Sequence, residues 1–124
     1  MGQQSPPDVA LVLIVDDDEE VLQVTAEVLE TLGYRALTAR TGPEAVEQLR
    51  ENLQISVLLT DIRMPDLGGE GLAGIAETWR PDIRVVFTSG FGRPRGNSDF
   101  LPKPYRAADL IRAFPPQPLP SSRA

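Results

Sequence analysis

Residues 57–65 have the sequence Val57-Leu58-Leu59-Thr60-Asp61-Ile62-Arg63-Met64-Pro65, in which an apolar run of strand length ends on one carboxylate and then meets a proline. A run of valine and leucine without polar alternation is typical of a strand buried on both faces, as in a parallel sheet covered by helices. Ligands of open α/β sheets bind outside the carboxyl ends of the strands. Asp61 is therefore predicted to lie at the functional edge of such a sheet, although a turn or helix-capping role stays open from its position alone.

The composition of the chain excludes several classes of function. The chain has 124 residues, which suits a single domain, and a formal net charge of -6. This acidity and the lack of a basic stripe argue against nucleic acid as a partner. The sequence has no Cys and no His, which removes thiolate and imidazole chemistry. Any chemistry must therefore use carboxylates, hydroxyls and amines.

The ends of the chain differ in composition from its middle. Residues 1–8 are polar and contain prolines, so we expect a flexible lead-in, with the ordered domain spanning 9–114. Residues 115–124 are rich in proline, and we expect a disordered tail. The apolar runs are far shorter than a membrane span, and the first residues lack the features of a signal peptide. We therefore expect no membrane contact by this chain and a cytoplasmic location.

Apolar runs and helical spacing alternate along the chain. Further strands are predicted at Ala10–Val15, Tyr34–Ala39, Ile83–Phe87 and Phe100–Leu101. Four helices are predicted between or after the strands, ending near Leu32, after Leu49, at Trp79 and at Phe114. Their predicted inward residues include Val24 in the first helix and Ile111 in the last. Alternation of strands with helices predicts a parallel sheet with right-handed crossovers and helices on both faces.

Such a sheet brings reactive side chains from four strand ends to one edge. These side chains are Asp16 and Asp17, Asp61, Thr88 with Ser89, and Lys103. Neighbouring carboxylates repel unless a cation lies among them, and an all-oxygen ligand set favours Mg²⁺ or Mn²⁺. Asp61 can then attack phosphorus, while Lys103 supplies a fixed cation and the Thr88 hydroxyl donates a hydrogen bond. The pattern thus predicts phosphoryl transfer to Asp61, with Ser89 open as a substitute for Thr88.

Four segments, in order, resemble the receiver domain of bacterial two-component response regulators. They are Val12-Leu13-Ile14-Val15-Asp16-Asp17, Leu59-Thr60-Asp61-Ile62-Arg63-Met64-Pro65 with Gly69 beyond it, Val86-Phe87-Thr88-Ser89-Gly90, and Phe100-Leu101-Pro102-Lys103-Pro104. The resemblance covers residues 10–114. It implies a flavodoxin-like, doubly wound α/β fold with five parallel strands in the order 2-1-3-4-5. It also implies a signalling domain rather than an enzyme, phosphorylated by a histidine kinase or a histidine phosphotransfer domain.

The resemblance also implies a role for each matching residue. Asp61 would be the phosphoacceptor. Asp17 would bind the metal directly, Asp16 often through water, and Arg63 through its backbone carbonyl. Thr88 and Lys103 would bind the phosphoryl group, with a cis peptide bond between Lys103 and Pro104. The switch residues would be Thr88, Ser89 and Phe100. The pattern around residues 88–91 is similar to receivers of hybrid kinases, so a stand-alone receiver and a kinase-attached receiver both stay open.

The same residues are also compatible with different roles and with two different classes of protein. Asp18, Glu19 and Glu20 fit a helix N-cap and first turn, and Asp16 or Asp17 alone could be such a cap. Lys103 could be solvated, and Phe100 could be a core residue. A haloacid-dehalogenase-like phosphohydrolase also uses an Asp nucleophile and Mg²⁺, but its Asp-x-Asp-x-Thr/Val pattern is not matched here. A receiver-fold binding module that signals without phosphorylation is a third possibility, and it has no need of the full set of acids, Thr88 and Lys103.

One segment departs from the family pattern. Residues 89–99 must hold the fourth helix of a receiver, yet they contain three glycines and a proline. Glycine costs ~1 kcal/mol and proline ~3 kcal/mol in a helix interior. The sequence therefore predicts a short or absent fourth helix, and we expect phosphorylation to order this loop.

Overall fold

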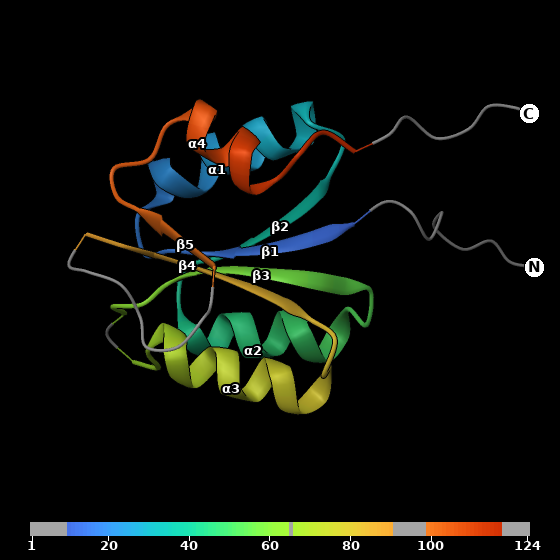
Figure 1. Ribbon diagram of the computed structural model, residues 1–124. Coiled ribbons are helices and arrows are strands. Elements are labelled where there is room, and N and C mark those ends of the chain that lie inside the picture. Colours follow the sequence, from blue (N-terminus) through green and yellow to red (C-terminus); the bar gives the residue numbers. More distant parts are fainter. Residues whose placement is uncertain (1–9, 65, 91–98, 118–124) are drawn as a thin grey trace, which may run out of the picture.

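Five parallel strands form one sheet in the computed structural model, which describes residues 10–64, 66–90 and 99–117 (Figure 1). The strand order is β2-β1-β3-β4-β5, as predicted. All four neighbouring pairs are parallel. The strands are β1 (Leu11–Val15), β2 (Arg35–Ala39), β3 (Ile55–Asp61), β4 (Arg84–Ser89) and β5 (Asp99–Pro102).

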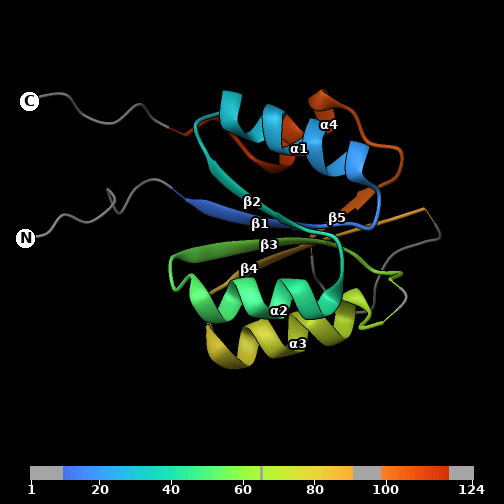
Figure 2. The same cartoon turned by 180° about the vertical axis from the view of Figure 1, so that it is seen from behind.

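Among the described residues, two helices cover each face of the sheet (Figures 1 and 2). One face carries α1 (Glu19–Thr31) and α4 (Ala107–Ala113), which contact each other. The other face carries α2 (Gly42–Glu51) and α3 (Gly69–Trp79), which also form a pair. The prediction of a doubly wound α/β fold is therefore confirmed.

The apolar runs of β1 and β3 supply both cores because successive side chains of a strand point to opposite faces. In β1, Val12 and Ile14 lie in the core beneath α1 and α4, whereas Leu11, Leu13 and Val15 lie in the core beneath α2 and α3. All five residues of β1 are buried. This is why the central strands lack polar alternation in the sequence.

Local signals place the helix ends. The Asp18 carboxylate accepts hydrogen bonds from the backbone N–H groups of Glu20 and Val21, so the predicted N-cap of α1 is confirmed. After the C-cap of α1, Gly33 has φ 96°, a conformation that favours glycine. The N-cap therefore starts α1 immediately after Asp16 and Asp17, the acidic residues that follow β1.

The capping box of α2 is formed with one difference from its ideal pattern. The Thr41 hydroxyl accepts a hydrogen bond from the Glu44 N–H at 3.1 Å. The Glu44 carboxylate, however, accepts from the backbone N–H of Arg40, at 2.7 Å, rather than from that of Thr41. The Glu44 carboxylate thus binds the residue before the N-cap instead of the N-cap itself.

The prediction of inward-facing side chains is wrong for two residues. Val24 of α1 is 57% exposed and Ile111 of α4 is 43% exposed. In α4 the inward stripe is Leu110 and Phe114, which are four residues apart, and Ile111 is rotated away from it. Both exposed side chains lie on the face of the molecule formed by α1 and α4.

The first residues of the predicted tail contact the folded domain. The backbone N–H of Gln117 donates to Leu32 O at 2.8 Å, and the Tyr34 hydroxyl donates to Pro115 O at 2.7 Å. The flexible lead-in, the rest of the tail and the core of the predicted loop at 91–98 lie outside the described residues. No helix in the described ranges is long and apolar enough to span a membrane.

Candidate functional site

Three strand ends place polar side chains in one row at the carboxyl edge of the sheet. Asp61 ends β3 and is paired in register with Thr88 of β4. Val15 pairs with Thr60, so the next residue of each strand brings Asp16 beside Asp61. The exposed fractions are 2% for Asp16, 8% for Asp61 and 2% for Thr88. The row predicted from the sequence is therefore a buried feature of the fold.

Lys103 joins the two buried carboxylates. Its Nζ lies 2.7 Å from Asp16 Oδ2 and 2.8 Å from Asp61 Oδ2. The backbone N–H of Lys103 donates to Ser89 O at 2.9 Å, which attaches the residue to the end of β4. The peptide bond between Lys103 and Pro104 is cis, as the resemblance implied. Lys103 is thus an ion-pair partner at the site, not a solvated surface lysine.

The remaining oxygens of the two carboxylates accept backbone hydrogen bonds. Asp16 Oδ1 accepts from the Asp18 N–H at 2.9 Å, and Asp61 Oδ1 accepts from the Arg63 N–H at 3.1 Å. Each carboxylate therefore has one oxygen bound to the ammonium and the other bound to the loop that follows its own strand. This arrangement fixes the orientation of both acids.

Asp17 completes a group of carboxylates that can hold a metal ion. One ligand oxygen from each of Asp16, Asp17 and Asp61 lies within 4.8 Å of the other two. Asp17 is exposed, unlike its two partners. Three carboxylate oxygens without nitrogen or sulfur donors fit the preference of Mg²⁺, which keeps several waters in its coordination shell. The donor set therefore suits the predicted metal.

Burial and charge act in opposite directions at this cluster. Burial raises the pKa of Asp16 above its ordinary value of 3.8, although the hydrogen bonds from Lys103 and from the Asp18 N–H act to lower it. For Lys103, burial acts to lower the pKa, but hydrogen bonds to Asp16 and Asp61 outweigh it and raise the pKa. Both pKa values are raised, but for different reasons. Burial prevails at Asp16, whose side chain is 3% exposed, whereas the contacts with the two carboxylates prevail at Lys103, whose side chain is 25% exposed.

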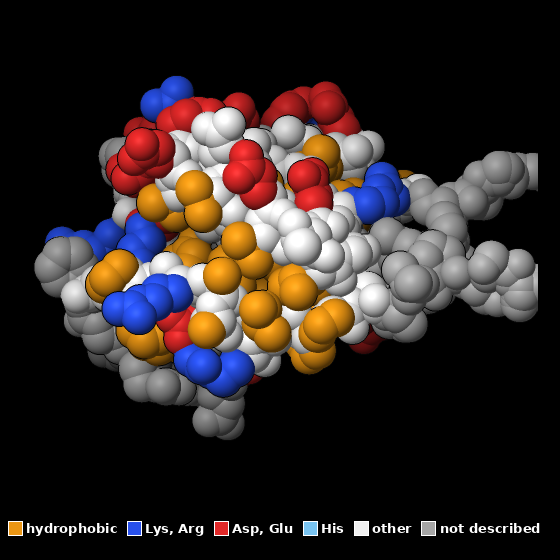
Figure 3. All heavy atoms as spheres, turned by 90° about the horizontal axis from the view of Figure 1, so that it is seen from above, with side chains coloured by type: hydrophobic (Ala, Val, Ile, Leu, Met, Phe, Trp, Pro, Cys, Tyr) orange, Lys and Arg blue, Asp and Glu red, His pale blue; other side chains and the backbone are white. Residues whose placement is uncertain are grey.

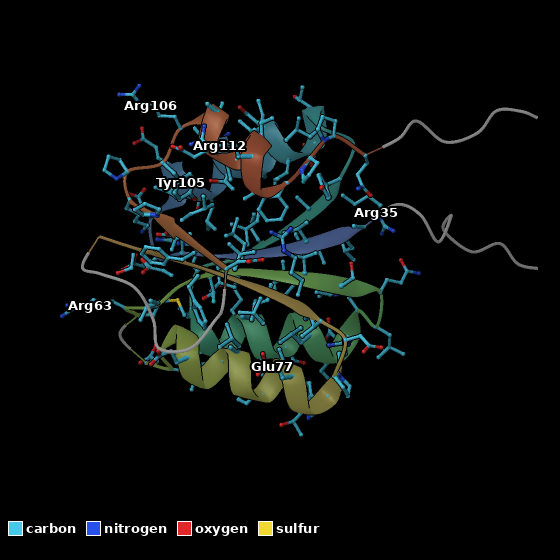
Figure 4. The ribbon with its side chains drawn as sticks, in the orientation of Figure 1. Arg35, Arg63, Glu77, Tyr105, Arg106 and Arg112 are labelled. Atoms are coloured by element: carbon cyan, nitrogen blue, oxygen red, sulfur yellow. The ribbon has the colours of Figure 1, made fainter. Side chains whose placement is uncertain are left out.

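The other predicted site residues lie around this cluster. Ser89 is buried next to Thr88, but successive strand residues alternate in direction, so only Thr88 shares the row of Asp61. Phe100 pairs with Phe87 and packs, partly buried, against the core under α2 and α3. The Arg63 side chain is exposed and projects away from the sheet (Figure 4). The backbone N–H of Arg63 donates to Asp61, so the backbone of this residue lies beside the acids.

The close approach of α3 to Asp61 was not predicted. The Gly69 N–H donates to Ile62 O at 2.9 Å, and a Cβ added to Gly69 would lie 2.2 Å from Asp61 O. The sequence signal for this contact is the glycine pair Gly68-Gly69 before the helix, which alone does not say what approaches it. Glycine thus allows α3 to begin against the backbone of the predicted phosphoacceptor.

A hollow of about 720 Å³ adjoins the acidic cluster between α1 and the loop after β5. Its walls are formed by residues from these two segments, namely Asp18, Glu20, Val21, Val24, Thr25, Lys103, Pro104 and Tyr105. Figure 3 shows the α1 and α4 side of the molecule, where acidic side chains gather toward one side and hydrophobic ones lie near the middle. The site is therefore open on the side of α1.

Comparison with known families identifies this fold. The family model described as the response regulator receiver domain matches residues 12–114. The chain belongs to the response regulator receiver family. The match runs from the second residue of β1 past the end of α4 and contains all the site residues described above.

Several known receivers are similar to this one. The response regulator receiver protein CpdR of Brucella abortus is 33% identical over 108 residues, which cover 81% of this chain and 89% of CpdR. The sensor kinase CckA of the same organism is 29% identical over 110 residues, but the match covers only 12% of that protein. The transcriptional regulatory protein CpxR of Escherichia coli is 30% identical over 107 residues, and the match covers 81% of this chain and 45% of CpxR. Receivers similar to this domain thus occur both alone and as parts of longer proteins.

Solved structures agree with this assignment. A response regulator receiver domain protein from Clostridium thermocellum superimposes with a TM-score of 0.77 at 31% identity, covering 85% of this chain and 90% of that one. The receiver domain from the hybrid histidine kinase CckA gives a TM-score of 0.76 at 32% identity, covering 84% and 94%. This chain is accordingly a receiver domain of two-component signalling.

Proposed function

We propose that this receiver domain accepts a phosphoryl group on Asp61 from a phosphohistidine of a partner protein, in a reaction that depends on Mg²⁺ or Mn²⁺. The observation that carries the proposal is the contact of one ammonium, that of Lys103, with both Asp16 and Asp61. The partner is a histidine kinase or a histidine phosphotransfer domain, because this sequence has no His of its own. The similarity to the receiver of a hybrid histidine kinase supports the same class of partner.

The acids that would hold the metal are Asp16, Asp17 and Asp61, with the Arg63 carbonyl as a further ligand. The first three offer oxygens close enough to share one ion. When bound, a divalent cation supplies positive charge that offsets repulsion between the carboxylates and the phosphoryl oxygens. Asp17 is exposed, so it can bind an ion that arrives from solvent with most of its water shell.

The transfer itself exchanges one bond to phosphorus for another. An Asp61 carboxylate oxygen attacks phosphorus and forms a P–O bond, while the P–N bond to the donor imidazole breaks and its electron pair returns to the ring nitrogen, which takes up a proton. The Lys103 ammonium and the Thr88 hydroxyl then face the transferred oxygens from the loop after β5 and from β4. The attacking group in this proposal is a carboxylate, which has no proton to lose, so the step needs no general base.

We further propose that the phosphoryl group acts on the residues beside Asp61. Thr88 shares the row of Asp61 and can move toward a phosphoryl oxygen, and the movement would pass to Ser89 and to Phe100 on the neighbouring strand. Phe100 is partly buried, which leaves it room to change its packing. The expected ordering of the loop after Ser89 belongs to this proposal and lies outside the described residues.

Intact-mass measurement tests the phosphoacceptor assignment. Incubation with Mg²⁺ and acetyl phosphate should add one phosphoryl group that alkali removes, and Asp61→Asn should abolish the addition. Asp66→Asn is the matched control, because Asp66 is an exposed acid of the same loop outside the carboxylate cluster. A donor domain that carries a phosphohistidine should phosphorylate the protein as acetyl phosphate does.

Two results would contradict the proposal. If no adduct forms, or if the adduct persists in Asp61→Asn, the protein is a receiver-fold binding module or uses another residue. Sustained hydrolysis of a phosphomonoester, with no stable adduct, would instead support the phosphohydrolase alternative.

A further inference from the structure

The loop after β5 is attached to the rest of the domain on two sides of Lys103. On one side, the Lys103 N–H donates to Ser89 O of β4 at 2.9 Å. On the other side, two residues later, the Tyr105 hydroxyl lies 2.8 Å from Thr25 Oγ1 of α1. Figure 4 shows Tyr105 on this loop, beside α1. The loop therefore spans from the sheet to the helix, with the ammonium-bearing residue between its two attachments.

The contact between the two hydroxyls is partly buried, with the Thr25 side of it enclosed in the protein. Thr25 is 1% exposed, although it occupies a position on the inward face of α1 that an apolar side chain could fill. Burial also raises the pKa of the Tyr105 hydroxyl above its ordinary value of 10.0, so this group stays protonated and able to donate. A buried hydroxyl that loses its partner destabilises a protein, which favours keeping this pair together.

We propose that the Thr25–Tyr105 hydrogen bond positions Lys103 for phosphoryl transfer, which makes Tyr105 a positioning residue. The bond links the loop of Lys103 to the helix that directly follows Asp16, Asp17 and the N-cap Asp18. The lysine side chain is long and flexible, so the place of its ammonium depends on where its backbone is held. Part of this inference rests on the proposed function, because the consequence for transfer requires that Asp61 be phosphorylated.

Four variants separate positioning from simple stabilisation. Tyr105→Phe and Thr25→Val each remove one hydroxyl and keep the shape of the side chain. The double variant Thr25→Val/Tyr105→Phe removes both hydroxyls, so it leaves no unpaired hydroxyl and should regain stability lost in the single variants. Thr25→Ser retains a hydroxyl at the same place, so it should keep the Lys103 spectrum and the phosphorylation rate, with a small loss of stability from the missing methyl group.

Tyr34→Phe is the matched control for loss of a tyrosine hydroxyl. The Tyr34 hydroxyl donates to Pro115 O at 2.7 Å, at the opposite edge of the sheet from Asp61. This variant should lose stability without any change at Lys103.

Lys103 is the only lysine in the sequence, so its side chain can be observed alone. In protein made with ¹³C-labelled lysine, the two ε-methylene protons should have distinct chemical shifts while the ammonium is held between Asp16 and Asp61. The spectra are recorded on the metal-free protein, and the rate of phosphorylation by acetyl phosphate is measured separately with Mg²⁺. Unfolding in urea gives the stability of each variant.

The positioning role predicts that the shift difference collapses in both single variants and in the double variant. Their phosphorylation rates should fall about ten-fold, since small misplacements of a reacting group are costly. The double variant is decisive, because its stability should recover while its rate stays low. Thr25→Ser and Tyr34→Phe should keep both the spectrum and the rate.

Three results would overturn the inference. The Lys103 signals and the rate could stay unchanged in Tyr105→Phe, the rate could fall without any change in the Lys103 signals, or stability and rate could recover together in the double variant. If the unmodified protein is not phosphorylated at all, the proposed function fails, whereas the metal-free spectra still decide whether Tyr105 positions Lys103.

Discussion

At Asp16, a single carboxylate is held between burial, which favours its neutral form, and Lys103, which favours its charged form. Because the pKa of Asp16 is raised from 3.8, the folded protein binds this proton more tightly than the unfolded chain does. The contribution to stability is therefore complete below pH 3.8 and is lost as the pH rises through the folded-state pKa. A functional arrangement that gathers charge thus costs stability at neutral pH.

The pH dependence of unfolding tests this balance. In metal-free buffer, the stability of the unmodified protein relative to Asp16→Asn should decrease as the pH rises from the ordinary Asp value toward neutrality. The Asn variant lacks the titrating group at this position, and urea unfolding at each pH gives the difference. Parallel stability curves for the two proteins would show that burial does not raise the pKa of Asp16.

Asp17 is exposed whereas Asp16 is buried, so a substitution of Asp17 should change metal affinity with little effect on the stability of the fold. Asp17→Asn removes a direct ligand of the proposed metal, so Mg²⁺ affinity should fall by at least about ten-fold. Because the side chain is exposed, the metal-free free energy of unfolding should change by only about 0.5 kcal/mol. Calorimetric titration with Mg²⁺ and urea unfolding give the two quantities.

Glu20→Gln is the control for this measurement. Glu20 is an exposed acid of the same run that is not part of the metal-binding group. Equal losses of Mg²⁺ affinity in Asp17→Asn and Glu20→Gln would mean that the acids attract the cation only through their total charge.

At the scale of elements, α3 provides an internal comparison between two glycines. A Cβ on Gly69 would collide with Asp61 O, whereas a Cβ on Gly74 meets nothing within 4 Å. Gly69→Ala should therefore destabilise the fold by about 1–3 kcal/mol and slow phosphorylation, because β3 or α3 must shift. Gly74→Ala should stabilise it by roughly 0.5–1 kcal/mol, since alanine is the better helix former.

Thermal and urea unfolding of the two variants measure both effects on the same helix. Equal changes in the two variants would mean that helix propensity alone governs these positions, and that the approach of α3 to Asp61 is not a tight one.

The sequence predicted the elements that depend on local patterns. The unbroken apolar runs located β1 and β3, and the run of acids with a helical stripe behind it located α1 and its cap Asp18. It failed for Ile111, because α4 has only 7 residues and too few turns to define which apolar side chains face inward. It also gave no sign that Gln117 binds the turn after α1, since such a contact depends on the path of the chain in space.

For the site, residue types at strand ends were sufficient to bring Asp16, Asp61, Thr88 and Lys103 together. What could not be predicted are contacts between side chains on distant segments. Lys103 bridges two acids, and Tyr105 meets Thr25 across 80 positions of sequence. The first contact joins the loop after β5 to the ends of β1 and β3, and the second joins the same loop to α1, so no local pattern encodes either one.

At the scale of the whole molecule, the two ends of the described chain meet. The backbone N–H of Ala10 lies 3.4 Å from the Gln117 side-chain oxygen, at the start of β1 (Figure 1). Asp16 follows the other end of that strand, roughly 17 Å away. The two described ends of the chain are thus neighbours in space, which is the geometry that permits circular permutation or insertion into another protein. A neighbouring module or a fluorescent label joined at either described end would lie near the start of β1 and leave the Asp61 edge uncovered.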